Sequence, residues 1–76
     1  MIGLAAIRRK TGVTQVELAA KLGVGQAQIS KIERQEDMLL STLASYIAAL
    51  GATAEIAVTV GEQTVTFDLT AGRRRA

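Results

Sequence analysis

Residues 14–34 read TQVELAAKLGVGQAQISKIER, and this stretch decides the fold of the chain. Thr14 and Glu17 stand at the spacing of a capping box, in which each side chain accepts a bond from the other residue's backbone N–H. Gly23 permits the left-handed backbone with which many helices end. The stretch therefore predicts two helices, one from the capping box to Gly23 and one over residues 26–34, joined by a short turn.

Seven positions of this stretch have the residue type that a helix-turn-helix needs. A small residue stands where the two helices cross, a glycine opens the turn, and five apolar residues fall on the side that must be buried. All seven in order, behind a capping box, are rarely met by chance; the alternative is an ordinary helical hairpin in a small α-bundle. The positions are Ala19, Gly23, Leu18, Leu22, Val24, Ile29 and Ile32.

Helical spacing also occurs on both sides of this stretch. Residues 2–11 predict a short helix that ends at Gly12, and residues 35–40 predict a loop. Ser41 is expected to cap a fourth helix over residues 42–50, which Gly51 stops.

The hydrophobic period changes to two after residue 52, which predicts strands. Apolar residues alternate with threonine and acidic residues on both sides of Gly61-Glu62. Glycine at the first of two turn positions suits a type II′ hairpin, although a four-residue loop would keep the same faces. With the two-residue turn, Val58 faces Val65 and Ile56 faces Phe67, so one face of the hairpin is wholly apolar.

The chain of 76 residues has the length of one small domain, and such a domain buries a limited core. It has no cysteine and no histidine, which excludes disulfides, thiol catalysis and the commonest metal ligands. Its carboxylates show no catalytic or metal-binding spacing. We therefore expect no enzyme, no metal and no cofactor. The absence of a membrane span, signal peptide and cysteine fits a cytoplasmic protein without a membrane partner.

The positive charge is concentrated in the helical part of the chain. Residues 1–52 carry six basic and four acidic side chains, whereas residues 53–76 carry three of each. A basic surface attracts phosphate by counterion release, although it can also be a solvated face without a ligand.

The sequence from residue 4 to about residue 50 resembles the phage-repressor class of helix-turn-helix proteins, also called the Xre family. TQVELA and ISKIE are the most specific segments, and Gly25 and Gln35 depart from the common pattern. The continuation STLASYIAALGATAEIAVTV resembles small antitoxins of the HigA type. The resemblance implies an α+β fold in which a four-helix, lambda-repressor-like domain (residues 1–51) precedes a β-hairpin (residues 52–70).

In this motif the second helix lies in the DNA major groove with its first residues toward the bases. Since Ile29 and Ile32 face inward, the opposite side of residues 26–34 must face DNA. A glutamine can pair with adenine, a lysine can donate to guanine, and the first N–H groups of a helix attract phosphate. For each side chain, the alternative is a solvated polar residue. The predicted DNA-binding residues are Gln15, Gln26, Ala27, Gln28, Ser30, Lys31 and Arg34.

The family resemblance gives Arg8 and Glu33 a different role. In the family, an arginine of the first helix pairs with a glutamate near the end of the recognition helix, and these two residues match those positions. The resemblance therefore implies a structural pair that holds the first helix to the third, and not a binding site.

The apolar hairpin face predicts a homodimer, because an isolated two-stranded hairpin is marginal in water and its open edges invite pairing. We expect two hairpins to form one four-stranded sheet packed on the fourth helix. Pairing through the fourth helix, or with a strand from a toxin, are the alternatives. Residues 71–76 are expected to be a disordered basic tail, with weak phosphate contact through Arg73–Arg75 as the alternative. The expected interface residues are Ile56, Val58, Val60, Val65, Phe67 and Leu69.

These observations favour a sequence-specific repressor that binds an operator in double-stranded DNA. The resemblance implies the antitoxin of a type II toxin–antitoxin operon that regulates its own promoter, with a small messenger-RNA nuclease as its toxin. The alternatives are a phage-type or stand-alone regulator without a toxin, and an interaction module that has lost DNA binding. Polar and basic residues on the outward stripe speak against the last.

Overall fold

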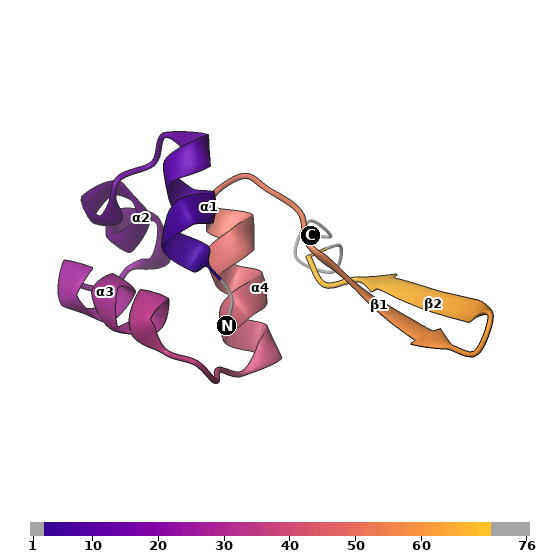
Figure 1. Cartoon of the computed structure of the whole chain (residues 1–76). Helices are drawn as coiled ribbons and strands as arrows, with labels where there is room; N and C mark the ends of the chain where they lie inside the picture. The colour runs from indigo at the N-terminus through magenta and orange to yellow at the C-terminus, as the bar shows by residue number, and fades with distance from the viewer. Residues whose placement is uncertain (1–2, 71–76) are drawn as a thin grey trace.

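The computed structural model of the chain describes residues 3–70, which form four helices followed by a two-stranded antiparallel hairpin (Figure 1). The predicted α+β fold is therefore confirmed. The predicted basic tail, residues 71–76, lies outside the described residues. The elements are α1 (Leu4–Thr11), α2 (Gln15–Leu22), α3 (Gln26–Arg34), α4 (Leu40–Ala49), β1 (Glu55–Val60) and β2 (Gln63–Asp68).

Both ends of α2 form as the sequence predicts. The Thr14 hydroxyl oxygen accepts from the Glu17 backbone nitrogen at 3.1 Å, and a Glu17 carboxylate oxygen accepts from the Thr14 nitrogen at 2.9 Å. Gly23 ends the helix with a φ of 72°. The Val24 nitrogen then bonds back to the Ala19 carbonyl oxygen at 3.0 Å, which closes the turn into α3.

The expected start of α4 is wrong by two residues. The helix begins at Leu40, so Ser41 is its second residue, and Leu39 takes the capping position without a side-chain bond to the helix. Leu39 is 72% exposed, and water can satisfy the first N–H groups of an exposed helix end. The helix ends at Ala49, one residue before the expected end, with Leu50 in the capping position and Gly51 next in the chain with a φ of 77°.

All four helices contribute to one hydrophobic core. Two predicted members, Leu22 and Leu43, are half-buried and pack against it. The expected burial of Val24 is wrong: its side chain is 40% exposed in the turn, where it lines a groove between α3 and α4. The buried core residues are Leu4, Leu18, Ala19, Ile29, Ile32, Tyr46, Ile47 and Leu50.

The hairpin has the predicted two-residue turn and register. Ile56 pairs with Phe67 and Val58 with Val65. Gly61, the first turn residue, has a φ of 62°, whereas Glu62, the second, does not have a positive φ. A type II′ turn requires a positive φ at its first central position only.

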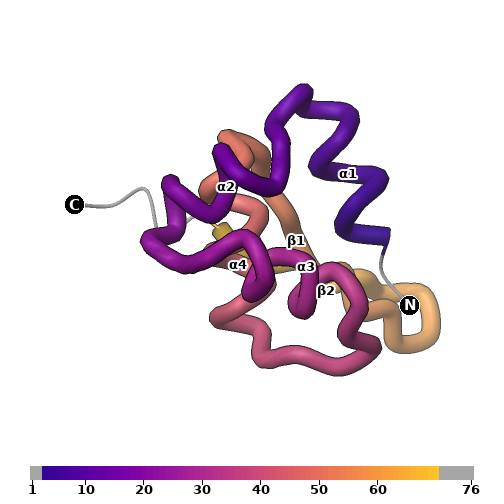
Figure 2. The backbone as a smooth tube through the Cα atoms, turned by 90° about the vertical axis from the view of Figure 1, so that its left-hand side faces the viewer, coloured from indigo at the N-terminus to yellow at the C-terminus, as the bar shows by residue number. Residues whose placement is uncertain are grey.

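The hairpin extends away from the helical body, and α2 and α3 lie on the side of the molecule opposite to it (Figures 1 and 2). Ile56 and Leu69 of its apolar face are half-buried, but the part of this face near the turn has little cover from its own chain. Val60 is 71% exposed, Val65 62% and Phe67 52%. The expected packing of a four-stranded sheet on α4 involves a second chain and stays a prediction.

Candidate DNA-binding surface

Helix α3 presents a polar surface because its apolar residues are fixed in the core. Ile29 is fully buried and Ile32 is 7% exposed. At 3.6 residues per turn, these two positions leave the opposite side of the helix free. Ser30 is half-buried, and the other predicted contact residues of this helix are exposed, namely Gln26, Ala27, Gln28, Lys31 and Arg34.

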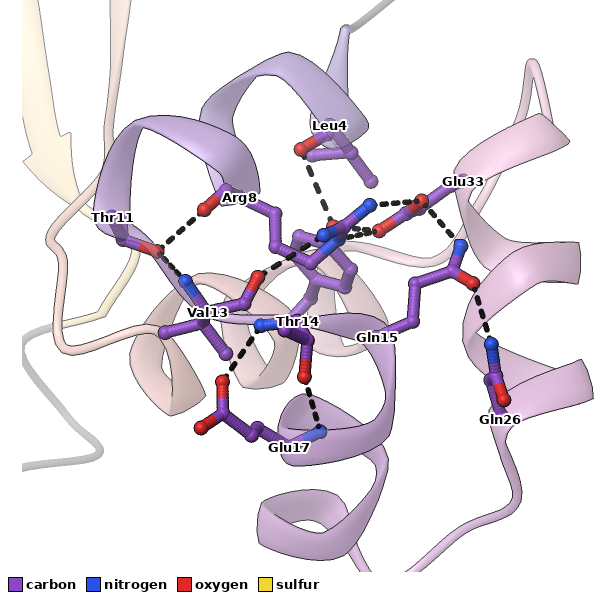
Figure 3. A network of polar contacts seen from close by, with 10 residues as sticks. Leu4, Arg8, Thr11, Val13, Thr14, Gln15, Glu17, Gln26 and Glu33 are labelled. Atoms are coloured by element: carbon purple, nitrogen blue, oxygen red, sulfur yellow. Dashed lines mark hydrogen bonds and ion pairs between the residues drawn. The ribbon is translucent and has the colours of Figure 1, made fainter.

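The first residues of α2 and α3 are joined by a hydrogen bond between their side chains. The Gln26 amide nitrogen donates to the Gln15 amide oxygen at 3.1 Å (Figure 3). The structure thus brings together two predicted DNA-binding residues that lie eleven positions apart in the sequence.

A shallow groove beside the start of α2 includes this glutamine pair. Arg9, Gly12 and Thr14 also line it. Because Arg9 lines the same groove as the first residues of α2, its positive charge lies near the first N–H groups of that helix, and its side chain is exposed. The groove therefore combines the features that attract a phosphate oxygen: a helix N-terminus, amide donors and a nearby cation.

The second half of α3 carries another contact between predicted residues. An Arg34 guanidinium nitrogen donates to the Ser30 hydroxyl oxygen at 2.7 Å. The hydroxyl keeps its own proton for donation, and Arg34 keeps its other N–H groups, because a guanidinium has five. Both side chains can therefore still reach a phosphate from this position.

The Arg8–Glu33 pair is present, as the family resemblance implies. Arg8 Nε donates to Glu33 Oε2 at 2.6 Å, and a second guanidinium nitrogen of Arg8 donates to the Val13 carbonyl oxygen at 3.0 Å. The side chains of Arg8 and Glu33 are only 10% and 6% exposed. This pair connects α1 to α3 beneath the polar surface.

Tyr46 of α4 completes this buried network, and the sequence reasoning missed it. Its hydroxyl donates to Glu33 Oε2 at 2.5 Å and lies 3.3 Å from the Leu4 carbonyl oxygen. The signal was available: Tyr46 is the only tyrosine, it stands in an apolar helix, and a buried tyrosine hydroxyl needs a partner. Nothing in the spacing indicated that the partner is Glu33.

The network shifts the pKa values of its members. Burial raises the pKa of Tyr46 well above its usual range, and the hydrogen bond to Glu33 raises it further. Burial also acts to raise the pKa of Glu33. Hydrogen bonds from Arg8, Tyr46 and Gln15, together with the Arg8 charge, outweigh that effect and leave the pKa of Glu33 below its usual value. Glu33 is therefore an ionised acceptor.

Two other kinds of feature are absent from the described residues. Within residues 3–70, no group of three or more acidic side chains is arranged to hold a metal ion. No helix in the same range has the length and apolar character needed to cross a membrane.

Comparisons with known proteins agree with this geometry. A family model described as "Helix-turn-helix" matches residues 4–55. Two Mycobacterium tuberculosis proteins named as antitoxins are similar in sequence: HigA3 is 44% identical over 82% of this chain, and HigA2 is 34% identical over 84%. The chain spans 60% and 65% of the lengths of these two relatives.

A solved structure has the same arrangement of elements. It is described as "Induced DNA bending by unique dimerization of HigA antitoxin" and is 39% identical to this chain, with a TM-score of 0.77. The match covers 88% of this chain and 93% of the solved one, so the likeness includes the hairpin as well as the helices.

Proposed function

The chain belongs to the helix-turn-helix family, and from this premise we propose that it is a sequence-specific DNA-binding repressor and the antitoxin of a toxin–antitoxin operon. One observation carries the DNA-binding part: α3 presents Gln26 and Lys31 to solvent while Ile29 and Ile32 hold its other side in the core. Glutamine and lysine are suited to base edges in the major groove. A module that had lost DNA binding would not need this polar and basic stripe.

The proposed contacts divide into two groups. Gln26, Ala27 and Lys31 reach base edges, because they lie on the exposed side of α3. Gln15, Gln28, Ser30 and Arg34 hold the phosphate backbone and set the position of α3 in the groove. This division follows the general rule that phosphate contacts position a protein and base contacts give specificity.

We further propose that the chain acts as a homodimer joined through its hairpins. Four residues of the hairpin's apolar face, Val58, Val60, Val65 and Phe67, are exposed in the single chain, and within residues 3–70 no third strand pairs with either edge. Two hairpins in one four-stranded sheet would cover both features. Since α3 lies opposite the hairpin, the dimer would hold its two recognition helices apart, and paired half-sites need a separation of roughly 34 Å.

The proposed second partner is a small toxin encoded beside this chain. Its support is the sequence similarity to two proteins named as antitoxins and to a solved HigA antitoxin. If the proposal is right, expression of the neighbouring gene alone arrests growth, and expression together with this chain restores it. A neighbouring gene without any effect on growth would favour a stand-alone regulator. Either role requires binding in the cytoplasm and no catalytic step.

DNA binding is tested on the promoter upstream of the chain's own gene. Fluorescence anisotropy with that duplex should give a Kd of about 10 nM or tighter at physiological salt, and a scrambled duplex should bind about 1,000-fold more weakly. Equal affinity for the two duplexes would contradict sequence-specific repression at this promoter.

A further inference from the structure

We propose that a hydrogen-bond network at the base of the hairpin sets the angle between the hairpin and the helical body, and thereby the spacing of DNA half-sites that a dimer accepts. This network, the clasp, joins Ala54, Asp68 and Thr70. None of the three is a proposed DNA contact or a residue of the expected dimer interface. The inference rests on the proposed hairpin dimer and on its binding to DNA.

The first arm of the hairpin is held to the end of α4. Residues 50–54 are the whole connection between α4 and β1. The Ala52 nitrogen donates to the Ile47 carbonyl oxygen at 3.2 Å, and Ala52 and Ala54 pack against the hydrophobic core. An attachment through this arm alone would still let the hairpin swing about the connection.

The clasp attaches the second arm. After β2, the Leu69 nitrogen donates to the Ala54 carbonyl oxygen at 2.8 Å, and the Thr70 hydroxyl oxygen accepts from the Ala54 nitrogen at 3.3 Å. The Thr70 hydroxyl and the Thr70 nitrogen both donate to Asp68 Oδ1, each at 2.9 Å. Ala54 is thus joined to the end of β2 through both its backbone N–H and its backbone C=O.

The burial of Thr70 makes this attachment stiff. Thr70 is 1% exposed, and a buried hydroxyl without partners would be costly. Here the hydroxyl gives its proton to Asp68 and accepts from Ala54, so both of its roles are used. A swing of the hairpin away from the body would break these bonds and expose Thr70. Since the core holds one arm and the clasp holds the other, the hairpin has one preferred angle.

The angle matters because α3 and the hairpin lie on opposite sides of the molecule (Figures 1 and 2). The described residues extend over 42 Å, and the clasp lies between the two ends. A rotation of about 10° on a lever of roughly 20 Å moves α3 by roughly 3.5 Å, and DNA rises about 3.4 Å per base pair. In a dimer joined through the hairpins, the clasp therefore restricts the two recognition helices to one half-site spacing. Asp68 and Thr70 are positioning residues.

The test uses the full-length chain and the promoter upstream of its own gene. Footprinting locates the two half-sites, and a series of duplexes then lengthens or shortens the gap between them by one base pair at a time. Fluorescence anisotropy gives the affinity for each duplex. Thermal melting and sedimentation verify that each variant is folded and dimeric before it is compared.

Two variants break the clasp and two leave it intact. Thr70→Val removes the buried hydroxyl at similar volume, and Asp68→Ala removes its acceptor at an exposed position. Thr70→Ser keeps the hydroxyl. Thr66→Val is the matched control, because Thr66 is an exposed threonine of β2 outside the clasp.

The wild-type chain should bind the natural gap about tenfold more tightly than a gap changed by one base pair. Thr70→Val and Asp68→Ala should reduce this preference to about threefold or less, because a looser hairpin lets α3 reach neighbouring spacings. Thr70→Ser and Thr66→Val should keep the wild-type preference. The preference for the natural half-site sequence over a scrambled one should stay the same in all four variants, since α3 is unchanged.

Three results would overturn the inference alone. They are a wild-type dimer that binds all gaps equally, broken-clasp variants that keep the wild-type preference, and a loss of affinity that is the same at every gap, as a purely structural role would produce. If Thr70→Val fails to fold, Asp68→Ala decides. A monomeric wild-type chain, or one that binds scrambled DNA equally well, would refute the proposed function itself.

A second measurement needs no DNA. The chain has no cysteine, so Lys21→Cys, at an exposed position of α2, gives one spin-label site per protomer. Pulsed electron paramagnetic resonance of the free dimer should show a narrow distance distribution between the two labels, with or without Thr66→Val. Addition of Thr70→Val or Asp68→Ala should broaden it. Distributions of equal width in all these chains would contradict the role of the clasp.

Discussion

Replacing Glu33 with leucine should destabilise the chain far more than replacing Arg8 and Glu33 with leucine together. The single change leaves the Arg8 guanidinium without its carboxylate in a site where its side chain is only 10% exposed. It also removes the acceptor for Tyr46 and for Gln15. The double change removes both charges and puts apolar volume in their place.

The expected cost of Glu33→Leu is about 3–5 kcal/mol, because one partner of a buried ion pair is left uncompensated. The free energy of unfolding of native proteins is about 5–15 kcal/mol, and small domains lie at the low end of this range. The loss expected for Glu33→Leu is therefore close to the total stability of the chain. The double variant should recover about 2 kcal/mol or more. It should not recover everything, since the Tyr46 hydroxyl then has only the Leu4 carbonyl oxygen within reach, at 3.3 Å.

Urea denaturation at fixed protomer concentration gives the three free energies of unfolding by linear extrapolation. Lys31→Ala is the control, because it alters an exposed position of the same helix as Glu33 and should change stability by no more than about 0.5 kcal/mol. The reasoning is refuted if the single and double variants lose equal stability, or if Glu33→Leu costs under about 1 kcal/mol.

Three further predictions concern pH, the hairpin and salt. The pKa of Glu33 lies below its unfolded value of 4.5, so its contribution to stability is present above that value and is lost as the pH falls below it. Urea melts between neutral pH and pH 3 should therefore show a steeper acid loss for the wild type than for the Arg8→Leu/Glu33→Leu double variant; parallel curves would contradict this. Phe67→Lys should shift the chain to monomer in sedimentation experiments, whereas Thr66→Lys, on the opposite face of β2, should leave the dimer intact. Equal dimerisation of both variants would show that the apolar face of the hairpin is not part of the dimer interface. The logarithm of the DNA association constant should fall by several units per decade of salt, and a slope near zero would exclude the proposed phosphate contacts.

Local chemistry made most of the fold predictable. The capping box at Thr14 and Glu17, the glycines that end α1 and α2 and open the hairpin turn, and the alternation after residue 52 each specify a structure within a few residues. Such signals do not depend on the rest of the molecule. The start of α4 differs from the expectation because Ser41 is a good cap in isolation, and the chain nevertheless begins the helix two residues earlier than expected, at an exposed leucine pair.

The polar network was only partly predictable, because it depends on which side chains meet in space. The Arg8–Glu33 pair is predicted by the family resemblance, and the exposed side of α3 is predicted by the helical period of its apolar residues. The bonds from Tyr46 to Glu33 and from Gln15 to Glu33 join residues 13 and 18 positions apart, across three helices. No periodicity within one helix encodes such contacts. Val24 shows the same limit, since its exposure depends on how closely α4 approaches the turn.

The claim that the exposed side of α3 reads base sequence is tested most directly by Lys31→Ala. Fluorescence anisotropy with the cognate duplex and a scrambled duplex, for the wild type and the variant, gives the ratio of the two affinities. If Lys31 contacts a base, the variant should lose about 1–3 kcal/mol on the cognate duplex and little on the scrambled one, so the ratio falls by about tenfold or more. Equal loss on both duplexes would reduce Lys31 to a phosphate contact, and no loss on either would contradict the placement of α3 in the groove.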